Sequence, residues 1–279
     1  MAQYRIDSQE YLANGTTIFE AVMLADKDGN IINSAGASAN INIAAGLVDG
    51  WSSISNFGTS GATAGTYTAS VWGKEDTIYP WATVAAGGTL TIATELPNGS
   101  SSTLDNGTHV HVYGLDVDFN PIDEQIDIVG ASGTGSTTFY RINKAVWHDG
   151  TSLQNKTEIR IKMGGTDVAW IKTGYGVSSS VLYTVPAGYT AYLTQGTASC
   201  NYGGDATGQM LVRLYDPSDD PGFINGHIFE ISGAGGQYLY PFSVPMRLPE
   251  KTDIDVRLTA RQNNTIMTAA YDIILIANS

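Results

Sequence analysis

The sequence predicts an all-β protein with two β-sandwich or jelly-roll-like domains and an N-terminal arm or hairpin. Apolar and polar residues alternate in many short segments, which is the pattern of strands with one buried face. The 279 residues include 32 glycines and only 15% charged residues, a composition typical of short strands joined by many turns. No stretch of helical period is long enough to contribute to a core. The length suits two β domains.

Residues 1–44 are predicted to form the N-terminal arm and hairpin. The opening residues are polar, and an apolar run at 18–24 follows them. Asp26-Lys-Asp-Gly-Asn30 then separates this run from Ile31, and Asp-Gly between two β runs is a strong hairpin signal. Two interpretations of the polar start stay open: a frayed chain end, or an arm that reaches a neighbouring subunit.

Residues 45–165 are predicted to form a β-sandwich domain that is rich in aromatic residues. Its large rings include Trp51, Trp72, Tyr79 and Trp81. Such rings offer a flat apolar area with a polar edge. They are therefore candidates for packing in the core or at a subunit interface, and alternatively for stacking on sugar rings.

The end of this domain is predicted from one clean strand and a glycine pair. Ile159, Ile161 and Met163 alternate with charged residues at 158, 160 and 162, which indicates a strand with one solvated face. Gly164-Gly165 follows directly and is the predicted domain boundary.

Residues 166–279 are predicted to form the C-terminal jelly-roll-like β-sandwich domain. Tyr183 to Leu193 has the pattern strand, turn, strand, with Pro186-Ala-Gly188 as the turn. The proline-rich segment 241–249 is predicted to lie at a sheet edge. Residues 253–258 alternate throughout, and residues 271–276 are apolar on both faces, which predicts a central buried strand.

Charge and cysteine content restrict the function classes. The net charge of −13 is unfavourable for binding phosphate backbones, so we expect no nucleic-acid partner. Solubility at high copy number explains this charge, and an acidic patch for a basic partner or a divalent cation is the alternative. The one cysteine, Cys200, precludes an internal disulfide and is expected to be buried and inert. We identify no secretion signal and no membrane-spanning segment.

Two short patterns resemble metal sites. Asp116, Asp118 and Asn120 follow the spacing that begins a calcium loop, so Ca²⁺ is a candidate cofactor. Pro121 stands where that loop needs glycine, and turn-forming Asp and Asn are the alternative explanation. His109-Val-His111 places two imidazoles on one strand face, but the further ligands of a cupin-type site are absent. Apart from these patterns, the sequence predicts no cofactor.

No catalytic motif is present in the sequence. We find no nucleophile elbow, no phosphate-binding Walker loop and no H-E-x-x-H metalloprotease motif. The adjacent carboxylates Asp123-Glu124 and Asp219-Asp220 do not have the spacing that selects a hydrolytic pair. We therefore predict that the protein is not an enzyme.

Several phrases, in this order along residues 45–276, resemble a family of virion structural proteins of tailed phages, chiefly those of marine and cyanobacterial hosts. They are Trp51 with Asn56-Phe-Gly58, followed by Val71-Trp72 and Tyr79-Pro-Trp81; His111-Val-Tyr-Gly-Leu-Asp116 with Glu124 downstream; Tyr183-Thr-Val-Pro-Ala-Gly188; and Pro249-Glu-Lys-Thr-Asp-Ile254.

This resemblance implies a non-enzymatic capsid decoration (cement) protein. Such proteins are commonly homotrimers of β-sandwich subunits that bind the major capsid protein. The resemblance therefore implies a location on the capsid exterior after synthesis in the cytoplasm of a bacterial host. The alternative is a tail-fibre or knob protein that binds host surface glycans through exposed aromatics. A bacterial extracellular sugar-binding or hydrolytic module is a third class, which the missing signal peptide disfavours.

Overall fold

The structure is a computed structural model that describes residues 43–63, 68–74, 77–149, 154–200, 205–214, 222–233 and 235–278. Within them the protein is all-β, as predicted, with sixteen strands and one short helix. The predicted arm and the Asp26–Asn30 hairpin lie outside the described residues, except for Ile43 and Ala44. No helix in the described part of the chain is long and apolar enough to cross a membrane.

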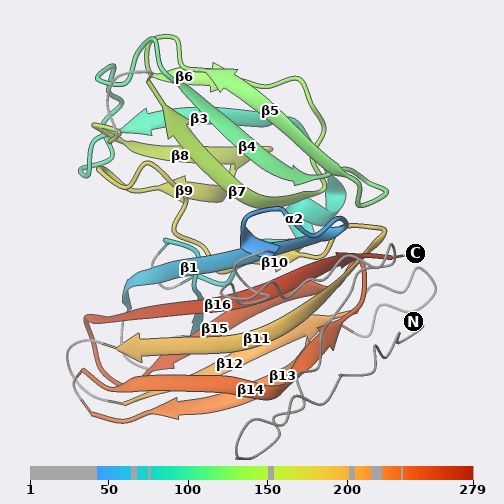
Figure 1. Cartoon of the computed structure of the whole chain (residues 1–279). Helices are drawn as coiled ribbons and strands as arrows, with labels where there is room; N and C mark the ends of the chain where they lie inside the picture. The colour runs from blue at the N-terminus through green and yellow to red at the C-terminus, as the bar shows by residue number, and fades with distance from the viewer. Residues whose placement is uncertain are drawn as a thin grey trace, which may run out of the picture.

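The elements follow one another along the chain as shown in Figure 1. They are β1 (Trp51–Thr63), β2 (Thr68–Ser70), α2 (Trp81–Ala86), β3 (Leu90–Glu95), β4 (His109–Leu115), β5 (Pro121–Asp127), β6 (Ser132–Thr134), β7 (Arg141–His148), β8 (Glu158–Met163), β9 (Thr166–Ile171), β10 (Tyr183–Thr184), β11 (Tyr189–Cys200), β12 (Ala206–Arg213), β13 (Ile224–Ile231), β14 (Gln237–Leu248), β15 (Asp253–Ala260) and β16 (Thr265–Ala277).

Strands β3–β9 form two sheets that we call the central sheet pair. One sheet has the order β6-β3-β8-β9 and the other β5-β4-β7. A single apolar cluster lies between them and includes Ile92 and Ile161 of the first sheet and Val110 and Trp147 of the second. Alternation explains this core, because Ile159, Ile161 and Met163 of β8 are buried while the charged residues between them stay half-exposed.

The remaining strands form a second pair, the terminal sheet pair. One sheet has the order β1-β16-β11-β14, and the other has the order β10-β15-β12-β13 with β2 added on β15. Their shared core includes Leu193 and Ile273 from one sheet and Val212 and Val256 from the other. Strand β16 lies between β1 and β11 with Ile273 and Leu275 buried, so the predicted central strand at 271–276 is confirmed in its position.

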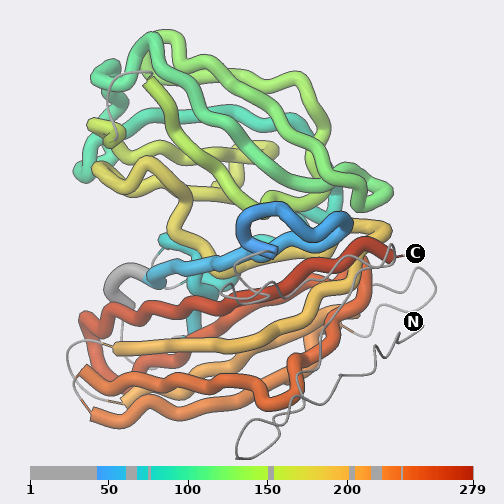
Figure 2. Tube along the Cα trace, viewed as in Figure 1, coloured from blue at the N-terminus to red at the C-terminus, as the bar shows by residue number. Residues whose placement is uncertain are grey.

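The course of the chain differs from the predicted segments 45–165 and 166–279. Figure 2 shows the chain starting in the terminal sheet pair, passing through the central pair and returning. Strand β1 pairs with β16, from Trp51 opposite Ile276 to Thr63 opposite Thr265, and β2 pairs with β15. The first two strands therefore belong with the C-terminal sheets, because their hydrogen-bonding partners lie about 200 residues further along the sequence.

Gly164-Gly165 is not a domain boundary. The two glycines form the turn of the β8–β9 hairpin, and both strands belong to one sheet. Both have positive φ, 57° and 85°, as a two-residue hairpin turn of type I′ requires. Gly164-Gly165 is therefore the tight connection between two neighbouring strands of one sheet.

The segment from Tyr183 to Leu193 does contain the predicted turn, with Gly188 at a positive φ of 76°. Its two strands lie in opposite sheets of the terminal pair, since β10 pairs with β15 and β11 lies between β16 and β14. The turn is therefore a link between sheets. Cys200, at the end of β11, is buried as expected, and burial raises the pKa of its thiol.

Candidate functional site

The four aromatic candidates make contacts within the chain. Trp72, Tyr79 and Trp81 are buried, and Tyr79 contacts both indoles edge-on at ring-centroid distances of 5.2 and 4.9 Å. Trp51 is half-buried and, like Ile274, packs against the cluster of Ile43 and Val48. Burial leaves Trp72, Tyr79 and Trp81 without the exposed ring face that stacking on a sugar would require.

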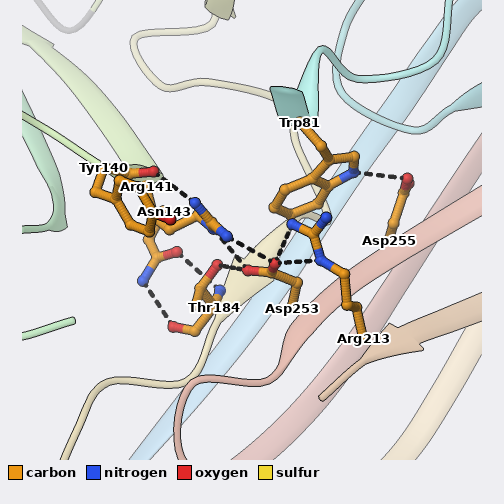
Figure 3. A network of polar contacts seen from close by, with 8 residues as sticks. All are labelled: Trp81, Tyr140, Arg141, Asn143, Thr184, Arg213, Asp253 and Asp255. Atoms are coloured by element: carbon orange, nitrogen blue, oxygen red, sulfur yellow. Dashed lines mark hydrogen bonds and ion pairs between the residues drawn. The ribbon is translucent and has the colours of Figure 1, made fainter. Parts of the chain in front are cut away.

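Trp81 is also part of a buried polar network, which the sequence patterns did not identify (Figure 3). Its indole N–H donates to Oδ2 of Asp255 at 3.0 Å, and the Asp255 carboxylate is fully buried. The same oxygen accepts from Ser70 Oγ at 3.2 Å and Arg257 Nε at 2.8 Å. Asp255 therefore ties helix α2 and the end of β2 to strand β15.

A second carboxylate, Asp253, is the centre of this network. The Arg141 guanidinium donates to both of its oxygens, at 2.8 and 3.0 Å. Arg213 Nη2 donates to Oδ2 at 2.6 Å, and Thr184 Oγ1 donates to Oδ1 at 2.6 Å. Burial alone would lower the pKa of Arg141, but the bidentate pair with Asp253 outweighs it and leaves that pKa above its usual value.

This network joins the two sheet pairs, and we call it the polar junction. Arg141 belongs to β7 of the central pair, whereas Asp253, Arg213 and Thr184 belong to β15, β12 and β10 of the terminal pair. Asn143 of β7 adds two bonds, because its side chain donates to the Thr184 carbonyl and accepts from the Thr184 amide. These ion pairs and hydrogen bonds run between the two sheet pairs, so the arrangement serves to hold the sheet pairs together.

The calcium candidates form the turn between β4 and β5. Asp116 Oδ1 accepts from the amides of Asp118 and Asn120 at 2.9 and 2.8 Å, and Oδ2 accepts from Asn120 Nδ2 at 3.2 Å. The Asp116 carboxylate thus stabilises the turn itself. The described residues contain no group of three or more His, Cys, Asp or Glu side chains placed to hold a metal ion.

The two histidines of β4 have separate partners. His109 stacks on His148 of β7, with ring centroids 5.4 Å apart. His111 Nε2 lies 2.6 Å from Asp123 Oδ2 of β5 on the exposed face of the same sheet. The two imidazoles therefore share a strand face, as alternation predicts, without converging on one point.

An exposed apolar surface follows strands β13 and β14, and we call it the β13–β14 apolar edge. It comprises Ile224, Ile228, Tyr240 and Val244, whose exposed fractions range from 40% for Tyr240 to 81% for Val244. Each strand is the last in its sheet, so both lie along one open side of the terminal sheet pair. The predicted proline-rich edge is thus confirmed as strand β14.

A small cavity opens behind this edge, between the two sheets. Its volume is about 30 Å³. Four rings surround His227 at centroid distances between 4.7 and 6.2 Å: Phe229, Tyr238, Tyr240 and Phe242. His227 Nε2 and Tyr238 Oη form a 2.7 Å hydrogen bond. The cavity is otherwise almost wholly apolar, so it suits an apolar group of a partner.

Charge is scarce along these two strands. Within the described strands β13 and β14, Glu230 and Arg247 are the only charged residues. Depletion of charge around a buried apolar centre is characteristic of the core of protein–protein interfaces. The β13–β14 apolar edge therefore has the composition of a contact surface.

Comparisons with known proteins give no family for this chain. No family model matches it, and no curated protein matches it. Solved structures of infectious bursal disease virus particles are similar over most of the chain. The Gt strain is 14% identical at a TM-score of 0.20, covering 82% of this chain and 73% of the viral chain. The Gx strain is 13% identical at 0.20, covering 81% and 70%. TM-scores this low assign neither fold nor function.

Proposed function

We propose that the chain is a non-enzymatic virion structural protein that decorates and stabilises a phage capsid from its exterior. In this proposal it binds the lattice of the major capsid protein as a homo-oligomer, with trimers favoured by the sequence resemblance. The observation that carries the proposal is the β13–β14 apolar edge. The proposal also takes the terminal and central sheet pairs as two β-sandwich domains, with the terminal pair jelly-roll-like.

The apolar edge supports a binding role because such surfaces are costly to leave in water. Val244 is 81% exposed and Ile228 is 55% exposed on neighbouring edge strands. Contiguous apolar patches on soluble proteins mark interaction sites more often than chance would give. Burying one such side chain contributes about 1.5–3 kcal/mol, so a few of them can anchor a partner.

Two prolines of strand β14 favour a partner that contacts the side chains of this strand over one that adds a further strand to the sheet. Pro241 and Pro245 lack the backbone N–H that a continuing sheet would need. Prolines on an edge strand also protect it against uncontrolled pairing with other chains. The partner would therefore cover the side chains of β13 and β14 and fill the ring-lined cavity behind them.

Decoration would stabilise a capsid because binding of the protein is thermodynamically linked to assembly of the lattice. A protein that binds only the assembled lattice lowers the free energy of that lattice relative to its dissociated subunits. A cyclic oligomer on a matching symmetry axis adds avidity, because several weak contacts form together. The polar junction would support this role, since it holds the sheet pairs in one relative orientation while load is applied.

The experiment that tests the proposal is localisation in purified particles. We expect many copies per particle by quantitative mass spectrometry, and density on the capsid exterior in an electron-microscopy map. A handful of copies confined to the tail would instead support the tail-fibre or knob alternative and would contradict decoration.

A matched pair of variants tests whether the β13–β14 apolar edge is the surface that contacts the capsid. Val244→Asp should abolish binding to capsids that lack the protein, because the new carboxylate would be buried without a partner on docking. Val129→Asp is the control, since Val129 is similarly exposed, at 77%, on a turn of the central sheet pair. Equal binding by both variants would show that the β13–β14 apolar edge is not the contact surface.

A further inference from the structure

A second surface feature lies on the outer face of the β1-β16-β11-β14 sheet, away from the cavity of the β13–β14 apolar edge. It is an open trough of about 540 Å³ that crosses all four strands. This volume falls within the range of about 300–1,000 Å³ that small-molecule sites occupy.

Two cross-strand rows of side chains shape this trough. In one row, Phe57 pairs with Ala270, Ala270 with Thr197, and Thr197 with Leu239. The next row is Thr59, Thr268, Ser199 and Gln237. The two central strands therefore contribute small side chains, and the edge strands contribute the larger Phe57, Leu239 and Gln237. Three strand spacings of about 4.8 Å give the trough a width of about 14 Å.

Two exposed rings line the trough. Phe57 is 57% exposed and Tyr175 is 52% exposed. The segment that follows Tyr175 comes close to β1, where Phe57 and Ser180 form an isolated bridge. Gly58 permits this approach, because a Cβ there would lie 3.0 Å from the Ser179 carbonyl oxygen and from the Ser180 backbone. Gly58 in β1 thus lets the segment after Tyr175 approach the strand that carries Phe57.

The rest of the lining combines small and apolar side chains with hydroxyl groups. Hydroxyl groups come from Thr59, Ser179, Thr197, Ser199 and Thr268, and Ser199 Oγ lies 2.6 Å from Thr268 Oγ1. Gln237 adds an amide. Among the described residues that line the trough, none carries a charge, although the chain as a whole has a net charge of −13.

We propose that this trough binds a neutral oligosaccharide. A sugar ring presents an apolar face of C–H groups, which packs on exposed aromatic rings such as Phe57 and Tyr175. Its hydroxyl groups donate and accept hydrogen bonds, which the Ser, Thr and Gln side chains can match. Sugars that carry carboxylate or sulfate groups find no cation in the lining and meet the acidic field of the chain.

The position of the trough disfavours a peptide in extended conformation. Peptides that add to sheets do so at an edge, where unpaired backbone groups supply the hydrogen bonds. Here the floor is formed by β16 and β11, which are paired on both sides. Only side chains are therefore available to a ligand, and their rings and hydroxyls match a saccharide.

This inference is independent of where the protein lies in a virion. A single site built from two rings and several hydroxyls binds weakly. Many copies on one particle would convert weak sites into strong attachment to a glycan-coated surface.

The test uses the full-length protein on an array of immobilised glycans that contains neutral hexose oligosaccharides beside sialylated and sulfated ones. We expect binding to neutral members. The affinity for the best neutral trisaccharide should fall roughly 3- to 10-fold in Phe57→Ala and in Tyr175→Ala, the range that one aromatic stacking contact supplies. Thr268→Arg should reduce binding further, because a long side chain would fill the floor of the trough.

The control is Tyr113→Ala, which removes an exposed ring from the central sheet pair. It should bind the same trisaccharide as the parent does, and thermal melting should confirm that all variants fold. The proposal is overturned if no neutral member of the array is bound, or if only acidic members are bound. It is also overturned if the double variant Phe57→Ala/Tyr175→Ala binds as tightly as Tyr113→Ala.

Discussion

The polar junction and the β13–β14 apolar edge reverse the usual distribution of residues between core and surface. At the junction, Arg141 and Asp253 are charged yet 3% and 1% exposed. At the edge, Ile228 and Val244 are apolar yet more than half exposed. The junction finds its partners within the chain, so its role is internal. The edge has no such cover among the described residues, and in the proposed function a partner covers it.

The largest effect is expected at the centre of the junction. Asp253→Asn would remove the counter-charge that the buried guanidinium of Arg141 has at Asp253. Breaking a buried ion pair from one side costs about 3–5 kcal/mol, so the free energy of unfolding should fall by that amount. Equilibrium unfolding in urea, followed by tryptophan fluorescence, measures it.

A hydrogen bond at the surface provides the control for this variant. Asp123 pairs with His111 at 2.6 Å, but its side chain is 59% exposed. Asp123→Asn should therefore cost less than about 1 kcal/mol. If the two variants lose similar stability, the polar junction does not hold the sheet pairs together.

A smaller effect is expected where helix α2 meets β15. Trp81→Phe removes the N–H that donates to the Asp255 carboxylate, and hydrogen bonds to charged groups contribute about 1.5–3 kcal/mol. Trp147→Phe removes a similar bond to the neutral hydroxyl of Thr108, which is worth about 0.5–1.5 kcal/mol. Trp81→Phe should therefore be less stable in urea than Trp147→Phe. The reverse order would show that packing of the ring, more than its hydrogen bond to Asp255, determines what Trp81 contributes to stability.

The sequence predicted the strands of the fold well but not which strand faces are covered. In β15, alternation correctly assigned Ile254, Val256 and Leu258 to the core. Asp253 and Asp255 on the other face are equally buried, because the central sheet pair covers them through β7 and α2. That cover depends on tertiary packing, for which periodicity along one strand carries no signal.

The same limit explains why the sequence patterns predicted neither the burial of the aromatic candidates nor the course of the chain between the sheet pairs. Trp72, Tyr79 and Trp81 have the composition of an exposed binding surface, yet they pack on one another and on the polar junction. Phe57 and Tyr175, which the structure exposes, stand 118 positions apart in the sequence and line one trough because the segment after Tyr175 bridges to β1. A short-range pattern does not detect such a pairing.

Alkaline pH should lower the free energy of unfolding through the buried tyrosines near the polar junction. Burial raises the pKa values of Tyr79 and Tyr271 above the ordinary value near 10. Above about pH 10 the unfolded chain releases these protons and the folded chain retains them, so the folded state binds more protons. Stability is therefore fully present below about pH 10 and falls above it, by about 1.4 kcal/mol per pH unit for each such group.

Tyr79→Phe is the variant that tests this dependence. The Tyr79 hydroxyl is buried with no hydrogen-bond partner in the described part of the chain, so its removal should cost little at pH 7. The variant should lose stability less steeply above pH 10 than the parent does. A parallel slope for both proteins, measured by urea unfolding at pH 8 to 11, would show that Tyr79 does not contribute.

The smallest effect is expected at the apolar edge, in the isolated protein. Val244→Thr changes an exposed side chain, so the free energy of unfolding should stay within about 0.5 kcal/mol of the parent. Val256→Thr places the same hydroxyl in the terminal core, where burial without a partner costs about 1–3 kcal/mol. If Val244→Thr costs as much as Val256→Thr, a segment of the chain itself covers the edge, and the surface is not available to a partner.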